Sequence, residues 1–132
     1  MDNKAAKIAY KLSWRPMGVF QIRNTANDKI YVGSSTDLNA IFNRTRFQLF
    51  AGAHPNKGLE ADWKLFGTGK FEFEILEEIF PREDVNYDYI ADLDTLEDLW
   101  LEKLQPYGEK GYNERKRSRE ERLQMIAANR KQ

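Results

Sequence analysis

The chain has 132 residues, of which 41% are hydrophobic and 32% charged, a composition that suits one folded domain with a packed core. It contains no cysteine, which excludes disulfides, thiolate zinc sites and cysteine nucleophiles. No apolar stretch is long enough to span a membrane, and no signal-type hydrophobic run follows the lysines near the start. A cytoplasmic location without membrane contact is therefore expected.

The formal net charge of +0 hides an uneven distribution of charge along the chain. Residues 1–66 carry ten basic and five acidic side chains, residues 67–108 carry three and twelve, and residues 109–132 carry eight and four. Clustered lysines and arginines suit a nucleic-acid phosphate backbone, and acidic residues gathered on another face are compatible with it. Ordinary solvated charge is the alternative that composition leaves open.

The first elements are predicted to be a β-hairpin and a helix. Residues 17–23 mix β-branched and aromatic residues, residues 24–28 supply turn formers, and the strand pattern resumes at residues 29–32. Hydroxyl and carboxyl side chains at residues 34–37 can then cap a helix. Its apolar residues recur at helical spacing as far as Gly52.

A short helix and a third strand are predicted in the middle of the chain. The loop that contains His54 precedes a helical pattern over residues 59–66, in which Trp63 and Phe66 are expected to pack inward. Residues 71–76 alternate apolar and acidic side chains with period two. That alternation predicts a strand with one buried and one solvated face.

The last part of the chain is predicted to hold one long helix and a basic end. Residues 81–92 are polar and turn-rich, and apolar residues recur along one helix face over residues 93–104. Residues 114–132 are highly charged and predict either a helix or a disordered basic tail. No internal repeat and no Gly-rich phosphate loop is present, so no nucleotide cofactor is expected.

Two short motifs carry a family resemblance. Gly18-Val-Phe is followed, eleven residues after Phe20, by Tyr31-Val-Gly, and this pair resembles the signature of the GIY-YIG nuclease superfamily. Further segments are similar to its homing-endonuclease branch, namely Gln21-Ile-Arg-Asn-Thr, Phe71-Glu-Phe-Glu-Ile-Leu-Glu-Glu, Leu96-Glu-Asp-Leu-Trp and Gly111-Tyr-Asn.

The resemblance implies a fold and a division of the chain. The fold is an α/β (α+β) domain, with a small, three-stranded, mainly antiparallel sheet flanked by helices. This nuclease-like domain would occupy residues 17–113, between an N-terminal extension at residues 1–16 and the basic helix or tail at residues 114–132. Oligomeric state is left open.

The resemblance also implies phosphodiester hydrolysis with one divalent ion, Mg²⁺ or Mn²⁺. Glu97 would be its protein ligand, since a lone carboxylate with phosphate oxygens and waters suits magnesium. Tyr31 would help to activate water, and His54 and Asn113 match further catalytic positions. From residue type alone, Glu97 is an exposed helix residue, Tyr31 a packed strand residue, and His54 and Asn113 are loop residues.

Three positions depart from the family pattern. Phe20 replaces the first signature tyrosine and lacks its hydroxyl, and Thr45 stands where a histidine or tyrosine is frequent. Ile41 stands ten residues beyond Tyr31, where the family carries a phosphate-binding arginine. Arg44 or Arg46 on the same helix is the candidate replacement, with a solvent-facing arginine as the equally weighted alternative. The predicted nucleic-acid-binding residues are Arg44, Arg46, Lys57, Arg115, Lys116 and Arg117.

Three functions compete at this point. The first is a metal-dependent endonuclease that acts on DNA, with RNA as the alternative substrate. The three departures would reduce its activity. The second is a catalytically degenerate scaffold that binds nucleic acid without cleaving it. The third is a protein-interaction domain that uses the acidic middle of the chain, which predicts negligible nucleic-acid affinity at physiological salt.

Overall fold

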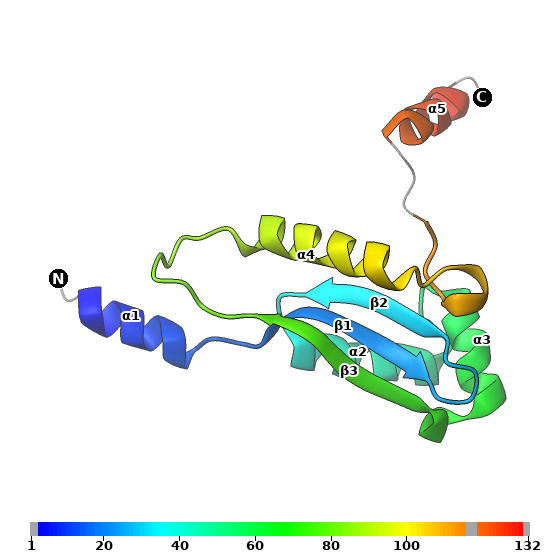
Figure 1. The fold of residues 1–132 in the computed structure, drawn as a ribbon, viewed down its shortest axis with the longest axis horizontal. Coiled ribbons are helices and arrows are strands. Elements are labelled where there is room, and N and C mark those ends of the chain that lie inside the picture. Colours follow the sequence, from blue (N-terminus) through cyan, green and yellow to red (C-terminus); the bar gives the residue numbers. More distant parts are fainter. Residues whose placement is uncertain (1–2, 116–118, 131–132) are drawn as a thin grey trace.

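The computed structural model describes residues 3–115 and 119–130 (Figure 1). Its centre is an antiparallel sheet in the order β2-β1-β3, formed by β1 (Met17–Asn24), β2 (Ile30–Ser35) and β3 (Phe71–Ile79). The helices are α1 (Asn3–Leu12), α2 (Leu38–Ala51), α3 (Lys57–Phe66), α4 (Tyr89–Leu104) and α5 (Arg119–Arg130). Single 3₁₀ turns occupy Thr68–Lys70 and Gly108–Lys110. The predicted class, a small antiparallel sheet flanked by helices, is confirmed.

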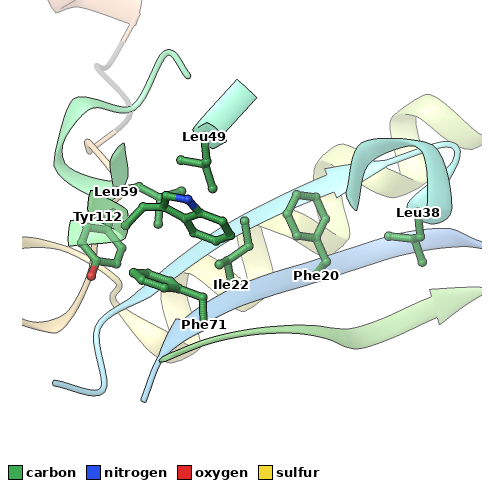
Figure 2. Close-up of a cluster of buried hydrophobic side chains, with 8 residues drawn as sticks. Phe20, Ile22, Leu38, Leu49, Leu59, Phe71 and Tyr112 are labelled. Atoms are coloured by element: carbon green, nitrogen blue, oxygen red, sulfur yellow. The ribbon is translucent and has the colours of Figure 1, made fainter. Parts of the chain in front are cut away.

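The larger hydrophobic core lies between the sheet and helices α2 and α3. Figure 2 shows Phe20 and Ile22 of β1 facing Leu38 and Leu49 of α2, and all four side chains are buried. Trp63 of α3 packs against the same cluster, as predicted. These buried aromatic and branched side chains supply most of the apolar surface that stabilises this face of the sheet.

A second core lies on the opposite face of the sheet, beneath α4. Val19 and Val32 pack there against Leu101, and all three are buried. The helix packs on β2 and β1 but not along the length of β3. The first half of β1 is therefore buried on both faces, which explains the apolar run Met17-Gly-Val-Phe at its start.

Helix ends follow the capping residues in the sequence. Asp37 accepts a hydrogen bond from the Ala40 amide at 3.1 Å at the start of α2. Asp88 caps α4 in the same way. Gly52, with φ of 70°, ends α2 in the left-handed conformation that glycine adopts without a steric cost.

A bulge explains why β3 is longer than the sequence predicts. The pairing of β1 with β3 shifts register so that Val19 faces Glu77 whereas Phe20 faces Ile75. Leu76 is thus an additional residue on β3, and it packs into the core beneath α4. The alternation of residues 71–75 is interrupted at the bulge, and the strand continues beyond it to Ile79.

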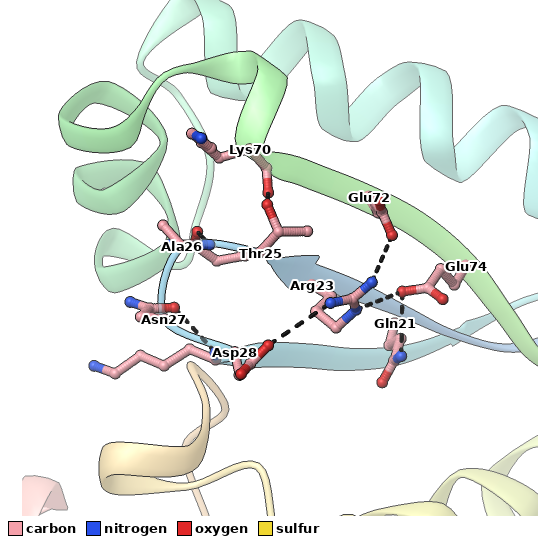
Figure 3. A network of polar contacts seen from close by, with 11 residues as sticks. Gln21, Arg23, Thr25, Ala26, Asn27, Asp28, Lys70, Glu72 and Glu74 are labelled. Atoms are coloured by element: carbon pink, nitrogen blue, oxygen red, sulfur yellow. Dashed lines mark hydrogen bonds and ion pairs between the residues drawn. The ribbon is translucent and has the colours of Figure 1, made fainter.

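Beyond α4, the sheet surface carries a polar network (Figure 3). The Arg23 guanidinium donates to Glu72 at 2.6 Å and to Glu74 at 3.0 Å, and it pairs with Asp28 at 3.7 Å. The face of β3 predicted to be solvated is therefore held against β1 by charge-assisted hydrogen bonds between neighbouring strands.

Of the two alternatives left open for residues 114–132, the helix is the one present, over residues 119–130. The structure differs from the sequence-based expectations in three places. Helix α1 was not predicted, and α4 begins at Tyr89 although residues 81–92 suggested only turns. Phe66, predicted to pack inward, is 37% exposed because it lies at the last turn of α3.

The two terminal helices stand apart from the sheet in different ways. Tyr10 of α1 is hydrogen-bonded through its hydroxyl to the Tyr89 hydroxyl, and the Trp14 ring packs edge-on against Tyr89. Figure 1 shows α5 projecting away from the sheet. No helix in the described parts of the chain is both long and apolar enough to cross a membrane.

Candidate active site

Tyr31 lies on the edge strand β2 and lines a surface cavity of about 300 Å³. Its ring packs edge-on against the His54 ring, with the ring centroids 5.8 Å apart. Burial raises the pKa of the Tyr31 hydroxyl above its ordinary value of 10.0, and the negative charge of Glu97 raises it further. The hydroxyl is therefore protonated at neutral pH, and it lies within the electrostatic reach of Glu97.

Glu97 is held on the third turn of α4, where it is half-buried. Leu96 and Trp100 of the same helix pack into the core beneath α4, and they fix how α4 lies on the sheet. The helix thereby brings a carboxylate toward β2 from the face opposite to α2. Its interaction with Tyr31 joins two residues that are 66 positions apart in the sequence.

His54 is a buried residue of the loop between α2 and α3, with 4% of its surface exposed. Its Nδ1 accepts a hydrogen bond from the Asn56 amide at 3.0 Å. Burial lowers the pKa of His54 below its ordinary value of 6.5. The ring is therefore neutral near pH 7, and because Nδ1 accepts, Nε2 carries the proton.

Asn113 behaves as a one-residue extension of the sheet. Its side chain accepts a hydrogen bond from the Val32 amide at 2.8 Å and donates to the Val32 carbonyl at 2.8 Å. The Tyr112 amide donates to the Ile30 carbonyl at 2.9 Å just before it. Both backbone neighbours of Tyr31 are thus tied to this segment, so Asn113 fixes the strand that presents the Tyr31 side chain.

Glycine at position 111 is required for this arrangement. A Cβ atom there would lie 2.4 Å from the Pro106 carbonyl oxygen and 2.5 Å from that of Ile30. Gly33 has a similar role on β2, because a Cβ atom would lie 2.8 Å from Cζ of Phe20. Gly33 and Gly111 therefore allow close packing around Tyr31.

The three departures from the family pattern are packed as core residues. Phe20 and Thr45 are each 3% exposed, and the Phe20 ring packs edge-on against Phe42 at a centroid distance of 5.4 Å. Ile41 is half-buried and packs against the same cluster. At these positions the chain has exchanged polar groups for apolar packing or a short hydroxyl.

The two candidate arginines lie on opposite flanks of α2. The Arg46 guanidinium stacks over the Phe73 ring of β3 at 4.2 Å. Residues two apart on a helix differ by about 200°, so Arg44 projects from the other flank of α2. Ile41 occupies that same flank, one turn earlier. Arg44 is exposed, whereas the Arg46 guanidinium is held at β3.

The other predicted nucleic-acid-binding residues have different settings. Lys57, at the start of α3, pairs with Glu60 at 3.2 Å. The Arg115 guanidinium stacks over the Tyr107 ring at 4.5 Å. Lys116 and Arg117 lie outside the described residues, and the remaining two, Arg44 and Arg46, are the arginines of α2.

Asn56 is a site residue that the sequence did not single out. Its side chain accepts from the Leu59 amide at 2.9 Å and donates to the Tyr112 carbonyl at 2.7 Å. It therefore caps α3 and joins the His54 loop to the segment of Asn113. In the sequence, Asn56 stands just before a helical pattern. That position indicates a helix-capping residue but does not indicate that the side chain lines a cavity.

The donor set fits a magnesium site with a single protein carboxylate. Among the described residues, no group of three or more His, Asp or Glu side chains is arranged to hold a metal ion. Glu97 is the acidic side chain that acts on Tyr31. Magnesium keeps several waters and is bound through one or two carboxylates together with substrate phosphates. A single glutamate whose charge reaches Tyr31 is compatible with that requirement.

Comparison with known proteins identifies relatives of this chain. A model of the GIY-YIG catalytic domain matches residues 16–113. Intron-associated endonuclease 1 of Enterobacteria phage T4 is 33% identical over 87 residues, which cover 66% of this chain and 32% of that protein. The chain thus corresponds to about a third of the length of this relative.

Solved structures agree with the sequence match. The catalytic domain of the homing endonuclease I-TevI superposes with a TM-score of 0.63 at 32% identity, covering 76% of this chain and 99% of the domain. A mutant form of the same catalytic domain gives a TM-score of 0.64 at 29% identity, with 78% and 97% covered. The chain belongs to the GIY-YIG family.

Proposed function

We propose that the chain is an endonuclease domain that hydrolyses phosphodiester bonds of DNA with the help of a divalent cation. The observation that carries the proposal is the grouping of four side chains from separate elements at Tyr31. Tyr31 and Asn113 line one cavity, His54 packs against the Tyr31 ring, and the charge of Glu97 reaches the Tyr31 hydroxyl. Tyr31 comes from β2, His54 from a loop, Glu97 from α4, and Asn113 from the segment after the last 3₁₀ turn. Protein family and cavity chemistry point to the same reaction.

Tyr31 and His54 are the groups that handle the attacking water. The Tyr31 hydroxyl keeps its proton at neutral pH and has lone pairs that can orient and polarise a water molecule. The neutral His54 ring presents a donor at Nε2 and no positive charge. Nε2 of His54 can therefore donate a hydrogen bond to the Tyr31 oxygen or to a phosphate oxygen. The neutral ring forms no ion pair when no substrate is bound.

Glu97 would hold the divalent cation, with Mg²⁺ or Mn²⁺ as the candidates. A bound cation supplies charge neutralisation to the attacked phosphate and the leaving oxygen. Glu97 itself, placed by α4, would contribute the anchoring carboxylate. Its half-buried position keeps the charge close to Tyr31.

Arg44 is the proposed phosphate clamp in place of the family arginine. Tyr31 lies four residues before the end of β2, about 13 Å along the strand, and Arg44 lies six residues into α2, about 9 Å along the helix. The short connection sends α2 back along the sheet (Figure 1). By this estimate the two residues have similar heights along the sheet, which supports assigning Arg44 to the phosphate bound at Tyr31.

DNA is the proposed substrate because the relatives are described as homing and intron-associated endonucleases. Ten basic residues against five acidic ones in residues 1–66 supply attraction for its phosphates. RNA carries the same phosphate chemistry and is the alternative substrate.

A nucleic-acid-binding module without catalysis is the second candidate function. The burial of Phe20 and Thr45 and the apolar packing of Ile41 favour it, because none of them can stabilise charge on a phosphate. Removing a charged transition-state contact typically costs about two to three powers of ten in rate. The choice between the two functions depends on whether Arg44 supplies the charged contact to the phosphate.

The test is cleavage and binding measured on the same preparation. Purified protein is incubated with supercoiled plasmid in Mg²⁺ or Mn²⁺ and in EDTA, and duplex binding is measured in parallel by fluorescence anisotropy. Metal-dependent conversion of supercoiled to nicked or linear plasmid is expected. Salt-sensitive binding without conversion in any metal would establish the binding module instead.

A further inference from the structure

Two surface cavities meet beside the proposed active site. The cavity of about 300 Å³ that Tyr31 lines shares Pro55, Asn56 and Glu114 with a second cavity of about 420 Å³. The second cavity continues past Asn56 to Lys29 and Lys57. The shared lining residues make the two one continuous groove, which is longer than a single phosphate requires.

Lys29 is the basic residue best placed in this groove. It lies just before β2, is half-buried, and its Nζ lies 5.7 Å from the centroid of the Tyr112 ring. Within residues 3–115 and 119–130 its ammonium group forms no ion pair. Lys57, on the other wall, is exposed and already pairs with Glu60. Lys29 therefore keeps its charge available to a ligand in the groove.

The spacing between Lys29 and Tyr31 matches a step along a nucleic-acid strand. Two residues along an extended chain span about 7 Å and place their side chains on the same face. Both side chains do lie on the α3 side, since Tyr31 contacts His54 and Lys29 contacts Tyr112. Adjacent phosphates of one strand are separated by a comparable distance. A strand with one phosphate at Tyr31 thus brings its neighbour to Lys29.

The acidic residues of the groove form no ion pair with Lys29 among the described residues. Asp62 accepts through Oδ2 from the Tyr112 hydroxyl at 2.6 Å and from the Asn27 side-chain amide at 3.3 Å, which orients its carboxylate toward those two groups. Glu114 is exposed at the rim. The Tyr112 ring that faces Lys29 is itself fixed by Asn24, which donates to its hydroxyl at 3.1 Å. The wall beneath Lys29 is therefore rigid.

From this geometry we propose that the groove is a subsite for the nucleotide next to the cleaved bond, and that Lys29 binds its phosphate. The inference rests on the proposed function, because it requires a nucleic-acid strand at Tyr31. It adds to that function a second phosphate position, on the α3 side of the scissile one.

The test compares Lys29→Gln with Lys29→Arg and with Lys70→Gln as the matched control. Lys70 is an exposed lysine of the 3₁₀ turn before β3, outside the groove. Each variant is built in the complete chain, with Glu97→Gln added so that the DNA stays intact. Binding of a short DNA duplex is measured by fluorescence anisotropy over a range of salt concentrations, and circular dichroism checks the fold.

Lys29→Gln is expected to lower the slope of the logarithm of affinity against the logarithm of salt by about one. Lys29→Arg and Lys70→Gln should keep the slope of the Glu97→Gln parent. Equal slopes for Lys29→Gln and the parent would overturn the subsite while leaving the proposed function intact. If the parent itself does not bind the duplex, and the unaltered chain does not cleave plasmid, the proposed function and the subsite both fail.

Discussion

The ring and the hydroxyl of Tyr31 have different roles. The ring packs against His54 and the larger core, so it contributes to stability like any half-buried aromatic residue. The hydroxyl interacts with the charge of Glu97 and is the group proposed to act on the attacking water. Removing only the oxygen therefore separates the two roles.

Tyr31→Phe should lower the rate of plasmid cleavage by about two to four powers of ten, the usual range for a group that assists proton transfer. The free energy of unfolding should change by less than about 1 kcal/mol, because the ring contacts are kept. Nicking rates and urea denaturation measure the two effects. A variant with full activity would show that the hydroxyl takes no part in catalysis.

The arginines of α2 give a matched pair of substitutions. Arg44→Gln should reduce cleavage by about two powers of ten or more, since it removes the proposed charged contact to the phosphate. Arg46→Gln should retain most of the activity, because the Arg46 guanidinium lies over Phe73 on the distant strand. Initial nicking rates of the two variants, compared at equal protein concentration, decide the assignment. Equal losses would mean that the effect comes from general charge rather than from position.

His54 predicts a pH dependence of stability with a defined sign. Burial lowers its pKa below 6.5 in the folded chain, so as pH falls the unfolded state takes up the proton first. Its stabilising contribution is therefore complete above pH 6.5 and is lost as the pH falls from there toward the folded pKa. The slope for one proton is at most about 1.4 kcal/mol per pH unit.

Urea denaturation at a series of pH values between neutrality and mild acid measures this slope. His54→Gln should flatten it, because His54 is the only histidine and carboxylates titrate at lower pH. An unchanged slope in the variant would mean that another group is responsible.

At the scale of elements, residues whose partners are close in sequence were the predictable ones. Asp37 and Gly52 bound α2 as their local chemistry predicts. Helix α1 was missed because the partner of Tyr10 is Tyr89, 79 residues away. The bulge at Leu76 was missed for the same reason: its extra residue exists only relative to the register of β1.

Asn113 gives a prediction for the edge of the sheet. Asn113→Ala removes both hydrogen bonds to the Val32 backbone, and leaving those groups unpaired should lower the free energy of unfolding by about 1–3 kcal/mol. Cleavage should fall as well, because the strand carrying Tyr31 loses its support. Asn43→Ala, at an exposed site on α2, is the control and should stay within about 0.5 kcal/mol. Equal stability of the two variants would contradict the structural role of Asn113.

At the scale of the whole molecule, the site is assembled from distant parts of the chain. The motifs around Tyr31 and Glu97 marked candidate residues, but their spacing said nothing of the electrostatic contact between them. The flank of α2 that faces β2 could not be derived from sequence, because it depends on the Arg46 contact with Phe73. Asn56 and Lys29 were missed since their role arises from the groove, which no local pattern encodes.

The charge distribution predicts how the whole molecule meets DNA. Basic residues outnumber acidic ones in residues 1–66 and 109–132, so duplex affinity should fall steeply with salt. Replacing Arg115, Lys116 and Arg117 together with glutamine should weaken binding and reduce the salt slope by up to about three. Anisotropy titrations measure both quantities. An unchanged slope would exclude this segment from the interface.

The most direct test of the central claim is plasmid cleavage by two charge-neutralised variants of the same helix. Glu97→Gln removes the proposed cation ligand, and Asp94→Asn makes the same change at an exposed position one turn earlier on α4. In Mg²⁺ or Mn²⁺, the unaltered chain and Asp94→Asn should nick supercoiled plasmid at similar rates, whereas Glu97→Gln should be inactive, as the unaltered chain should be in EDTA. Cleavage that survives in Glu97→Gln, or that proceeds in EDTA, would contradict a metal-dependent endonuclease centred on Glu97 and Tyr31.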